Sequence, residues 1–247
     1  MTQALVLGAL GLIVGNVIAR VSLRLPADED LRGRAPCRSC GATLKLWSVV
    51  SVFSWVARRG RCADCGARIS ARSPLVELAA AGVGVWSGLL GQDWLSAAST
   101  ALLGWQLVLI GIVDAEHFWL PDVLTMPLMV SGLGAALLLD RSGAHHHLIG
   151  AAAGFAGLWL LAFAYRRVRG RQGLGGGDPI LFAGCGAWVG WQGLPGVLVW
   201  ACLAGLGLVL TRVLLRRTVS GADRLPFGVF LAIGTWIVWL TGSVGPA

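Results

Sequence analysis

The stretch Gly173-Leu174-Gly175-Gly176-Gly177-Asp178-Pro179 marks the point where a polar loop gives way to a long apolar run. Glycine has no side chain and proline fixes its own φ angle, so this backbone can bend tightly and let another chain lie close against it. Asp178 followed by Pro179 is also a helix-start signal, with the carboxylate as N-cap and proline at the first helical position. Helix capping and a functional carboxylate are therefore both open interpretations of Asp178.

The composition around this stretch is that of a membrane protein. The chain has 247 residues, of which 56% are hydrophobic and 13% charged, and its mean hydropathy is +0.74. Such values exclude an ordinary soluble domain. We expect an all-α polytopic membrane protein with about eight transmembrane helices, because apolar segments near spanning length recur at about residues 4–23, 75–91, 95–113, 123–139, 148–165, 179–193, 194–211 and 228–245.

The basic residues indicate topology and do not suggest a nucleic-acid partner. Of 20 Lys and Arg, 11 lie at positions 20–72, four at 166–171 and four at 212–224, with only Arg141 elsewhere. These groups fall at alternate ends of the expected helices, and the positive-inside rule makes those ends cytoplasmic. Both termini then face outward. The first apolar stretch has no basic region before it and no small-residue cleavage site, so we expect a retained helix in a multi-pass protein of the cytoplasmic membrane.

The only sizeable polar segment, residues 26–73, follows a first transmembrane helix at residues 1–25 and holds two C-x-x-C pairs. The pairs are separated by 21 residues, a spacing close to that of a four-cysteine zinc ribbon, and each is followed by a glycine suited to a tight turn (Cys37, Cys40, Gly41; Cys62, Cys65, Gly66). Cytoplasmic thiols stay reduced, which favours a metal over disulfides. We expect a small zinc-ribbon-like insertion with a structural zinc ion, because four thiolates leave no open coordination position.

The remaining residues, 74–247, are expected to form a membrane core that carries the chemistry. The segment after the third apolar run holds Asp114, Glu116 and Asp122, and its predicted level in the membrane is that of Asp178. Two aspartates at one depth can activate water against a peptide carbonyl, one ionised as base and one protonated as acid. Asp122 follows a proline and is better explained as a helix cap, whereas Glu116 has no comparable signal.

Helix ends suggest which aspartate has which role. Asp178 lies at an expected helix N-terminus, whose partial positive charge favours a carboxylate, and Asp114 lies at an expected C-terminus, which favours the acid. We therefore expect Asp178 as the base and Asp114 as the acid. Glu77 lies one turn into the second expected span, where a carboxylate is either favoured by the helix dipole or functional at the membrane edge.

The sequence resembles the type IV prepilin leader peptidases, which are GxGD-type membrane aspartyl proteases. The resemblance covers nearly the whole chain and rests on the paired cysteines together with Arg24-Leu25-Pro26, Arg72-Ser73-Pro74-Leu75-Val76-Glu77-Leu78, Val113-Asp114-Ala115, Leu120-Pro121-Asp122, Gly175-x-Gly177-Asp178 and Pro226-Phe227-Gly228. The chain departs from the family at Ile180, where a lysine is usual, and at Asn16 and Ala19 in the first-helix motif.

The resemblance implies cleavage of the basic leader from type IV prepilins or pseudopilins at the cytoplasmic membrane face. The family's catalytic aspartates fall on Asp114 and Asp178, and its glycine motif on Gly175 and Gly177. Relatives with the cysteine-bearing segment also methylate the new N-terminus with S-adenosylmethionine, and Glu77 is a candidate contributor to substrate or donor binding. The alternatives are a peptidase without methyltransferase activity, or a non-enzymatic transporter or scaffold with a structural zinc ribbon.

Overall fold

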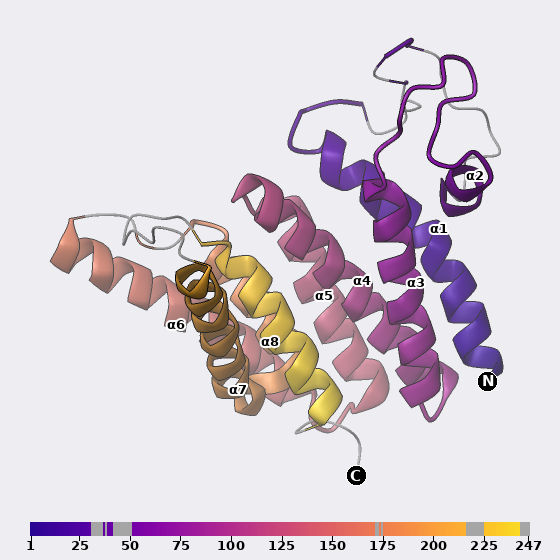
Figure 1. The fold of residues 1–247 in the computed structure, drawn as a ribbon. Coiled ribbons are helices and arrows are strands. Elements are labelled where there is room, and N and C mark those ends of the chain that lie inside the picture. Colours follow the sequence, from indigo (N-terminus) through magenta and orange to yellow (C-terminus); the bar gives the residue numbers. More distant parts are fainter. Residues whose placement is uncertain are drawn as a thin grey trace. The chain divides into compact units, whose positions relative to one another are not determined.

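The computed structural model describes residues 1–30, 37, 39–41, 51–170, 173, 175–215 and 225–242. Within these residues there is one isolated antiparallel β-bridge, and it joins Arg61 and Arg68. The helices, in chain order, are α1 (Thr2–Arg24), α2 (Ser51–Ala57), α3 (Arg72–Leu90), α4 (Trp94–His117), α5 (Asp122–Leu139), α6 (Ala144–Arg169), α7 (Asp178–Leu214) and α8 (Phe227–Thr241) (Figure 1).

The packing of the chain falls into two units, Met1–Leu109 and Ile110–Ala247. The first unit is built on the pairing of α1 with α3, in which glycines let the two backbones meet. Gly11 of α1 lies against the backbone at Ala80 and Ala81, and Gly84 of α3 lies against the backbone at Leu7. Close approach through small residues is the usual way in which helices associate in a lipid environment, where burial of apolar side chains gives little driving force.

The second unit holds a broken helix. At Gly190 the backbone of α7 leaves the helical region, with φ 68° and ψ 174°. This left-handed conformation favours glycine, because a side chain there would be strained. The break divides α7 into a first arm, residues 178–189, and a second arm, residues 191–214.

The two arms run in opposite directions along α8 (Figure 1). Trp188 lies near the end of the first arm, and Trp239 lies near the end of α8. Their rings meet edge-on, with centroids 5.3 Å apart. The second arm starts at the same level, where Gly193 packs against Val238, and reaches Phe230 near the start of α8 at Gly205. The first arm is therefore parallel to α8 and the second antiparallel to it.

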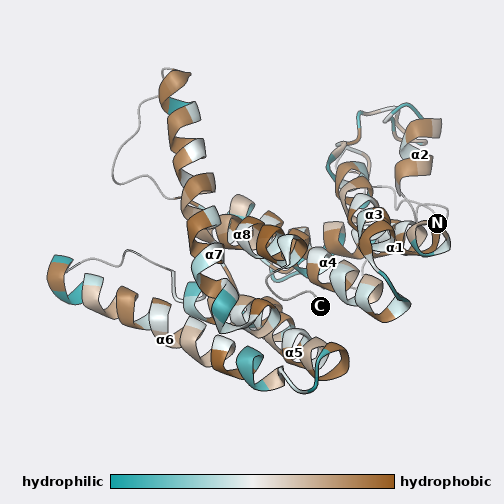
Figure 2. Ribbon diagram, turned by 90° about the horizontal axis from the view of Figure 1, so that it is seen from below, coloured by the Kyte–Doolittle hydropathy of each residue, from teal (hydrophilic) through white to brown (hydrophobic). Residues whose placement is uncertain are grey.

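The helices have the length and composition of membrane spans. Among the described residues six helices, α1, α3, α4, α5, α6 and α7, are long and apolar enough to cross a membrane, and α8 is a shorter apolar helix. Figure 2 shows apolar residues along the helices and hydrophilic ones gathered toward ends and connections, most clearly on α6. Large side chains such as Val199, Leu203 and Leu206 on the second arm are exposed, as expected of a surface that faces lipid.

The expected fold class is confirmed: the chain is an all-helical polytopic membrane protein with a cysteine cluster inserted after the first helix. The expected spans coincide with helices, and the sixth and seventh are the two arms of α7. The boundary between them lies at Gly190, a few residues before the expected division at 193/194. The expected third span stops at Val113, whereas α4 continues to His117, which places Asp114 inside its last turns. The division into residues 1–25, 26–73 and 74–247 stays a prediction.

Candidate active site and metal site

Asp178 is the first residue of α7, and its carboxylate reaches back into the glycine-rich loop. Oδ2 of Asp178 accepts a hydrogen bond of 2.8 Å from the backbone N–H of Gly175. The residue in the N-cap position is Gly177, so Asp178 does not cap α7 in the way that the Asp-Pro signal suggests. The side chain is only 6% exposed. The carboxylate is thus held by the loop before it.

The glycines of the loop provide space for neighbouring groups. A Cβ built on Gly175 would lie 3.2 Å from Asp178 Oδ2, so a side chain there would crowd the carboxylate. A Cβ on Gly177 would collide with the backbone oxygen of Leu120, whereas one on Gly176 would meet nothing within 4 Å. The close approach expected of this loop is therefore made at Gly177 by the chain's own Leu120.

Asp114 lies in the last turns of α4, and its carboxylate contacts the start of α8. Oδ2 of Asp114 accepts a hydrogen bond of 3.0 Å from the backbone N–H of Val229. A Cβ on Gly228 would lie 2.9 Å from the same oxygen, so only a glycine leaves the carboxylate room at this point. Asp114 is 5% exposed. Each aspartate is therefore buried, and each is held through Oδ2 by a backbone amide.

Leu120 lies between the surroundings of the two aspartates. Its carbonyl oxygen contacts Gly177, directly before Asp178, and its Cδ1 would lie 2.8 Å from a Cβ on Gly228, beside Asp114. The structure thus brings Asp114 and Asp178 to the two sides of one leucine. The competing carboxylates of Glu116 and Asp122 are exposed. Burial distinguishes the pair from its neighbours in sequence.

The geometry reduces the asymmetry expected from helix ends. Asp114 is near the C-terminus of α4, as expected, but its carboxylate accepts a hydrogen bond at the N-terminus of α8. The partial positive charge of that N-terminus favours an ionised carboxylate, as the N-terminus of α7 does for Asp178. Among the described residues neither Oδ1 atom has a hydrogen-bond donor. Both oxygens are therefore available to a water molecule or a substrate.

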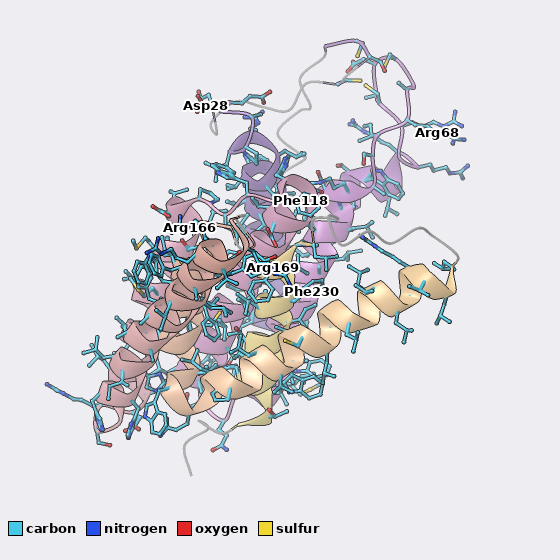
Figure 3. The ribbon with its side chains drawn as sticks, turned by 90° about the vertical axis from the view of Figure 1, so that its left-hand side faces the viewer. Asp28, Arg68, Phe118, Arg166, Arg169 and Phe230 are labelled. Carbon is cyan, nitrogen blue, oxygen red and sulfur yellow. The ribbon has the colours of Figure 1, made fainter. Side chains whose placement is uncertain are left out.

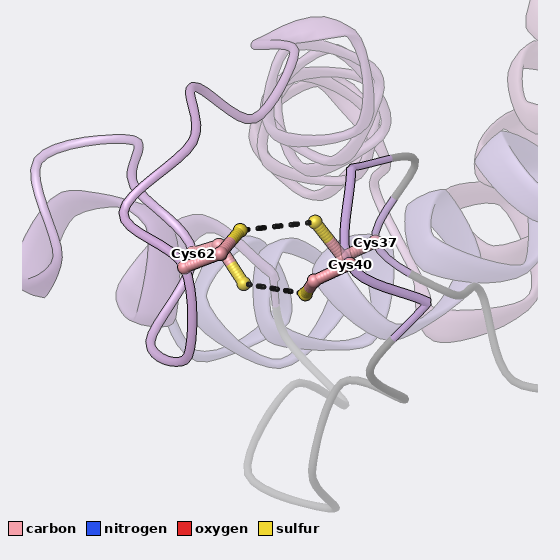
Figure 4. Close-up of side chains that lie close together, drawn as sticks. Cys37, Cys40 and Cys62 are labelled. Atoms are coloured by element: carbon pink, nitrogen blue, oxygen red, sulfur yellow. Dashed lines mark hydrogen bonds between the residues drawn. The ribbon is translucent and has the colours of Figure 1, made fainter.

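The four predicted metal ligands lie together. The sulfur atoms of Cys37, Cys40, Cys62 and Cys65 are all within 4.8 Å of one another. Cys37 Sγ is 3.8 Å from Cys65 Sγ and Cys40 Sγ is 3.9 Å from Cys62 Sγ (Figure 4). A tetrahedral ion with metal–sulfur bonds of about 2.3 Å separates its ligands by about 3.8 Å. The cluster has the donor set and the spacing to hold one metal ion.

Each half of the cluster is a tight turn closed by a glycine. Gly41 N–H donates to Cys37 O at 2.8 Å, and Gly66 N–H donates to Cys62 O at 3.1 Å. Both glycines have a positive φ, of 71° and 70°, and no other atom lies near the place of a Cβ. Hydrogen bonds from the backbone of Ser39 and then of Cys40 lower the pKa of the Cys37 thiol to about 6. The turn therefore favours the thiolate form that a metal requires.

Glu77 is fully buried in the first unit, on α3. Its Oε1 accepts a hydrogen bond of 2.8 Å from Asn16 of α1, and its Oε2 accepts one of 3.0 Å from the backbone N–H of Val52 on α2. Nearby, the Arg72 guanidinium donates to Ala19 O and to Ser22 Oγ on α1. Glu77 thus joins α1, α2 and α3, and Asn16 is its direct partner on α1.

Sequence reasoning assigned no role to three residues that shape the aspartate pair. Val229 supplies the amide that holds Asp114, Gly228 leaves space for that carboxylate, and Leu120 lies between the two aspartates. Gly228 and Leu120 stand in motifs that carry the resemblance. Nothing in the sequence, however, indicates that a helix starting about 115 residues later meets Asp114.

Comparisons with known proteins agree with this architecture. The model of the type IV leader peptidase family matches residues 101–210, and that of the bacterial peptidase A24 N-terminal domain matches residues 9–89. No solved structure gives a significant match to the chain.

Curated relatives are similar over most of their length. The prepilin leader peptidase/N-methyltransferase of Aeromonas hydrophila is 40% identical over 85% of this chain and 72% of its own. The proteins of the same name from Pseudomonas aeruginosa and Burkholderia pseudomallei are 38% and 36% identical, over 95% and 91% of this chain and 89% and 81% of their own. The chain therefore belongs to the type IV leader peptidase family.

Proposed function

We propose that this protein is a membrane aspartyl endopeptidase that removes the leader from type IV prepilins or pseudopilins and then N-methylates the new N-terminus. The observation that carries the proposal is the pair Asp114 and Asp178, both buried and both with one carboxylate oxygen free of described donors. The names of the relatives supply the substrate class and the second activity. A transporter or scaffold is not favoured by these matches.

The pair performs hydrolysis by sharing one proton. The ionised carboxylate takes a proton from a water molecule, whose oxygen attacks the scissile carbonyl carbon. The protonated carboxyl group gives its proton to the carbonyl oxygen, which forms a neutral tetrahedral diol. When the C–N bond breaks, the carboxyl group that took a proton from water gives it to the departing nitrogen. A diol hydroxyl group gives its proton to the other carboxylate, so that one carboxylate and one carboxylic acid remain. Because each carboxylate lies beside a helix N-terminus and accepts one backbone hydrogen bond, either can take the role of base.

The membrane places the substrate at this pair. A basic leader stays in the cytoplasm and the apolar helix of the precursor stays in the bilayer, so the scissile bond lies at the boundary between them. The distribution of Lys and Arg supports a cytoplasmic location for the Asp114 and Asp178 ends of α4 and α7. Gly176 is exposed, and a Cβ there would meet no described atom within 4 Å, so its backbone offers an extended substrate a surface for strand-like contact.

The four cysteines are proposed to hold a structural zinc ion. The sulfur spacing and the four-thiolate donor set fit tetrahedral zinc, and such a site has no open position for chemistry. The zinc ion would stabilise a segment that is too small to fold on its own core.

Methylation would use S-adenosylmethionine, which supplies an electrophilic methyl group to the new amine. No binding site for S-adenosylmethionine is identified among the described residues. Glu77 is unsuited to contact the donor directly, because it is fully buried and both of its oxygens accept hydrogen bonds within the first unit. We therefore propose that Glu77 positions α1, α2 and α3 and does not touch substrate.

Co-expression with a candidate prepilin tests the proposal, with mass spectrometry of the pilin product. The wild type should yield a shortened product that carries one extra methyl group on its N-terminus. Asp114→Asn and Asp178→Asn should leave the precursor uncut while still inserting in the membrane, and Asp122→Asn, at an exposed carboxylate, should cut normally. A shortened product without the methyl group would mean that the protein is a peptidase without methyltransferase activity. Cleavage by Asp114→Asn or Asp178→Asn at the wild-type rate would refute the aspartate mechanism.

A further inference from the structure

Beside the cysteine cluster, the first unit contains a cavity lined by arginines. It has a volume of about 570 Å³, and we call it the arginine pocket; its lining residues are Trp55, Arg58, Arg59, Gly60, Arg61, Arg68 and Ile69. Trp55 Nε1–H donates to Ile69 O at 3.1 Å. The Trp55 ring also packs on Gly60, where a Cβ would lie only 2.9 Å from the ring atoms. The pocket is thus a formed feature of the fold, fixed by the indole.

Four arginines line this pocket, and no acidic residue does. Arg61 and Arg68 face each other across an antiparallel bridge, where like charges are destabilising (Figure 3 shows the Arg68 side chain projecting away from the ribbon). Within the described residues no ion pair or side-chain hydrogen bond is formed by any of the four arginines. The whole segment 26–73 contains only four acidic residues, Asp28, Glu29, Asp30 and Asp64, none of which lines the pocket.

The pocket lies next to the membrane end of α3. Helix α2, which carries Trp55, donates its Val52 amide to Glu77, one turn inside the span α3. Phe53 and Val56 on α2 are 68% and 62% exposed, and their spacing places them on one side of the helix. A short helix with outward apolar side chains followed by arginines is suited to the boundary between headgroups and acyl chains.

We propose that the arginine pocket binds the phosphate of an anionic phospholipid, with Phe53 and Val56 in the adjoining membrane interface. Arginine presents a planar fork of donors that matches phosphate oxygens, and a phosphate between Arg61 and Arg68 removes their mutual repulsion. The lipid thereby fastens the cysteine-bearing segment to the membrane surface. The pocket belongs to the first unit and the aspartate pair to the second, and the basic leader of a precursor would be repelled by the arginines.

Hydrogen exchange on the full-length, zinc-loaded protein in nanodiscs tests this binding. Exchange of peptides within residues 55–69 is followed by mass spectrometry in phosphatidylcholine and in mixtures with rising phosphatidylglycerol. We expect slower exchange as phosphatidylglycerol is added. Each arginine near an anionic surface changes the affinity for anionic lipid roughly fivefold. The double variant Arg58→Gln/Arg68→Gln should therefore bind phosphatidylglycerol roughly 25-fold more weakly and lose the protection from exchange in every mixture. Arg58→Lys/Arg68→Lys should keep part of it.

Two controls identify the ligand and its source. Arg166→Gln/Arg167→Gln removes the same charge from the end of α6 and should leave the protection intact. Inorganic phosphate added to phosphatidylcholine nanodiscs should not reproduce it. The zinc content of each variant reports whether the segment is folded, and the lysine variant decides the test if the glutamine variant loses zinc. Three results would overturn the proposal: protection from exchange that is equal with and without phosphatidylglycerol, protection that free phosphate also supplies, or loss of protection in Arg166→Gln/Arg167→Gln equal to that in the Arg58/Arg68 glutamine variant.

Discussion

The carboxylate of Asp114, near the end of α4, accepts its hydrogen bond from the backbone N–H of Val229, in the first turn of α8. Asp178 is held in the same way by the amide of Gly175. Backbone amides cannot rotate away or change charge, so each carboxylate has a fixed direction and a fixed donor on one oxygen. The other oxygen of each accepts no hydrogen bond from the described residues.

The rate of cleavage should have a bell-shaped dependence on pH. The reaction requires one aspartate ionised and one protonated, so activity should fall at low pH, where both are protonated, and at high pH, where both are ionised. The measurement is kcat/KM for a peptide substrate in detergent over a wide pH range. A profile with a single limb would mean that only one carboxylate titrates in the working range, and the shared-proton mechanism would then be wrong.

Gly177→Ala should reduce cleavage strongly, because the new methyl group would collide with the backbone of Leu120 and displace the start of α7 that carries Asp178. We expect a loss on the order of 100-fold, as small displacements of reacting groups commonly cause. The adjacent Gly176→Ala is a matched control, since its methyl group would meet no atom within 4 Å. Turnover of both variants is compared at equal membrane levels. Equal activities would show that the contact with Leu120 does not set the position of Asp178.

Glu77→Gln should destabilise the first unit while the chain keeps nearly the same volume. A glutamine amide has one acceptor oxygen and one donor NH2 group. It cannot replace both carboxylate oxygens, so either the Asn16 amide or the Val52 N–H loses its acceptor. The expected cost is about 1–3 kcal/mol in the free energy of unfolding. Denaturant titration in detergent measures it, with Glu29→Gln, at an exposed site, as the control. Combination with Asn16→Ala should give less than the sum of the single effects, because the two residues share one interaction.

Removal of the metal should affect the cysteine-bearing segment and spare the cleavage of a short peptide. We expect one zinc ion per chain, lost in Cys40→Ser and retained in Cys202→Ser, whose thiol lies outside the cluster on the second arm of α7. Elemental analysis gives the zinc content, and hydrogen exchange should become faster in residues 60–69 of the zinc-free variant. Loss of peptide cleavage together with zinc would assign the ion a part in the reaction.

Local patterns in the sequence were sufficient for the spans and the metal ligands. An apolar run of spanning length predicts a helix wherever it packs, and two C-x-x-C pairs predict a cluster because the ligand spacing is local. Burial of Asp114 and Asp178, against exposure of Glu116 and Asp122, could not be predicted, because it depends on α8 and Leu120 coming from elsewhere in the chain. The capping interpretation of Asp178 failed for a related reason: the sequence does not show which way the carboxylate turns.

The break at Gly190 also governs how this region enters the bilayer. At 1.5 Å per residue the arm from Asp178 to Val189 is only about 18 Å long, well short of the roughly 30 Å hydrocarbon layer. That arm cannot become a stable membrane segment during synthesis until the longer arm, packed beside α8, has been made. The Asp178 carboxylate at its start therefore reaches its final depth only when the hairpin inserts as one body, after the second arm has been synthesised.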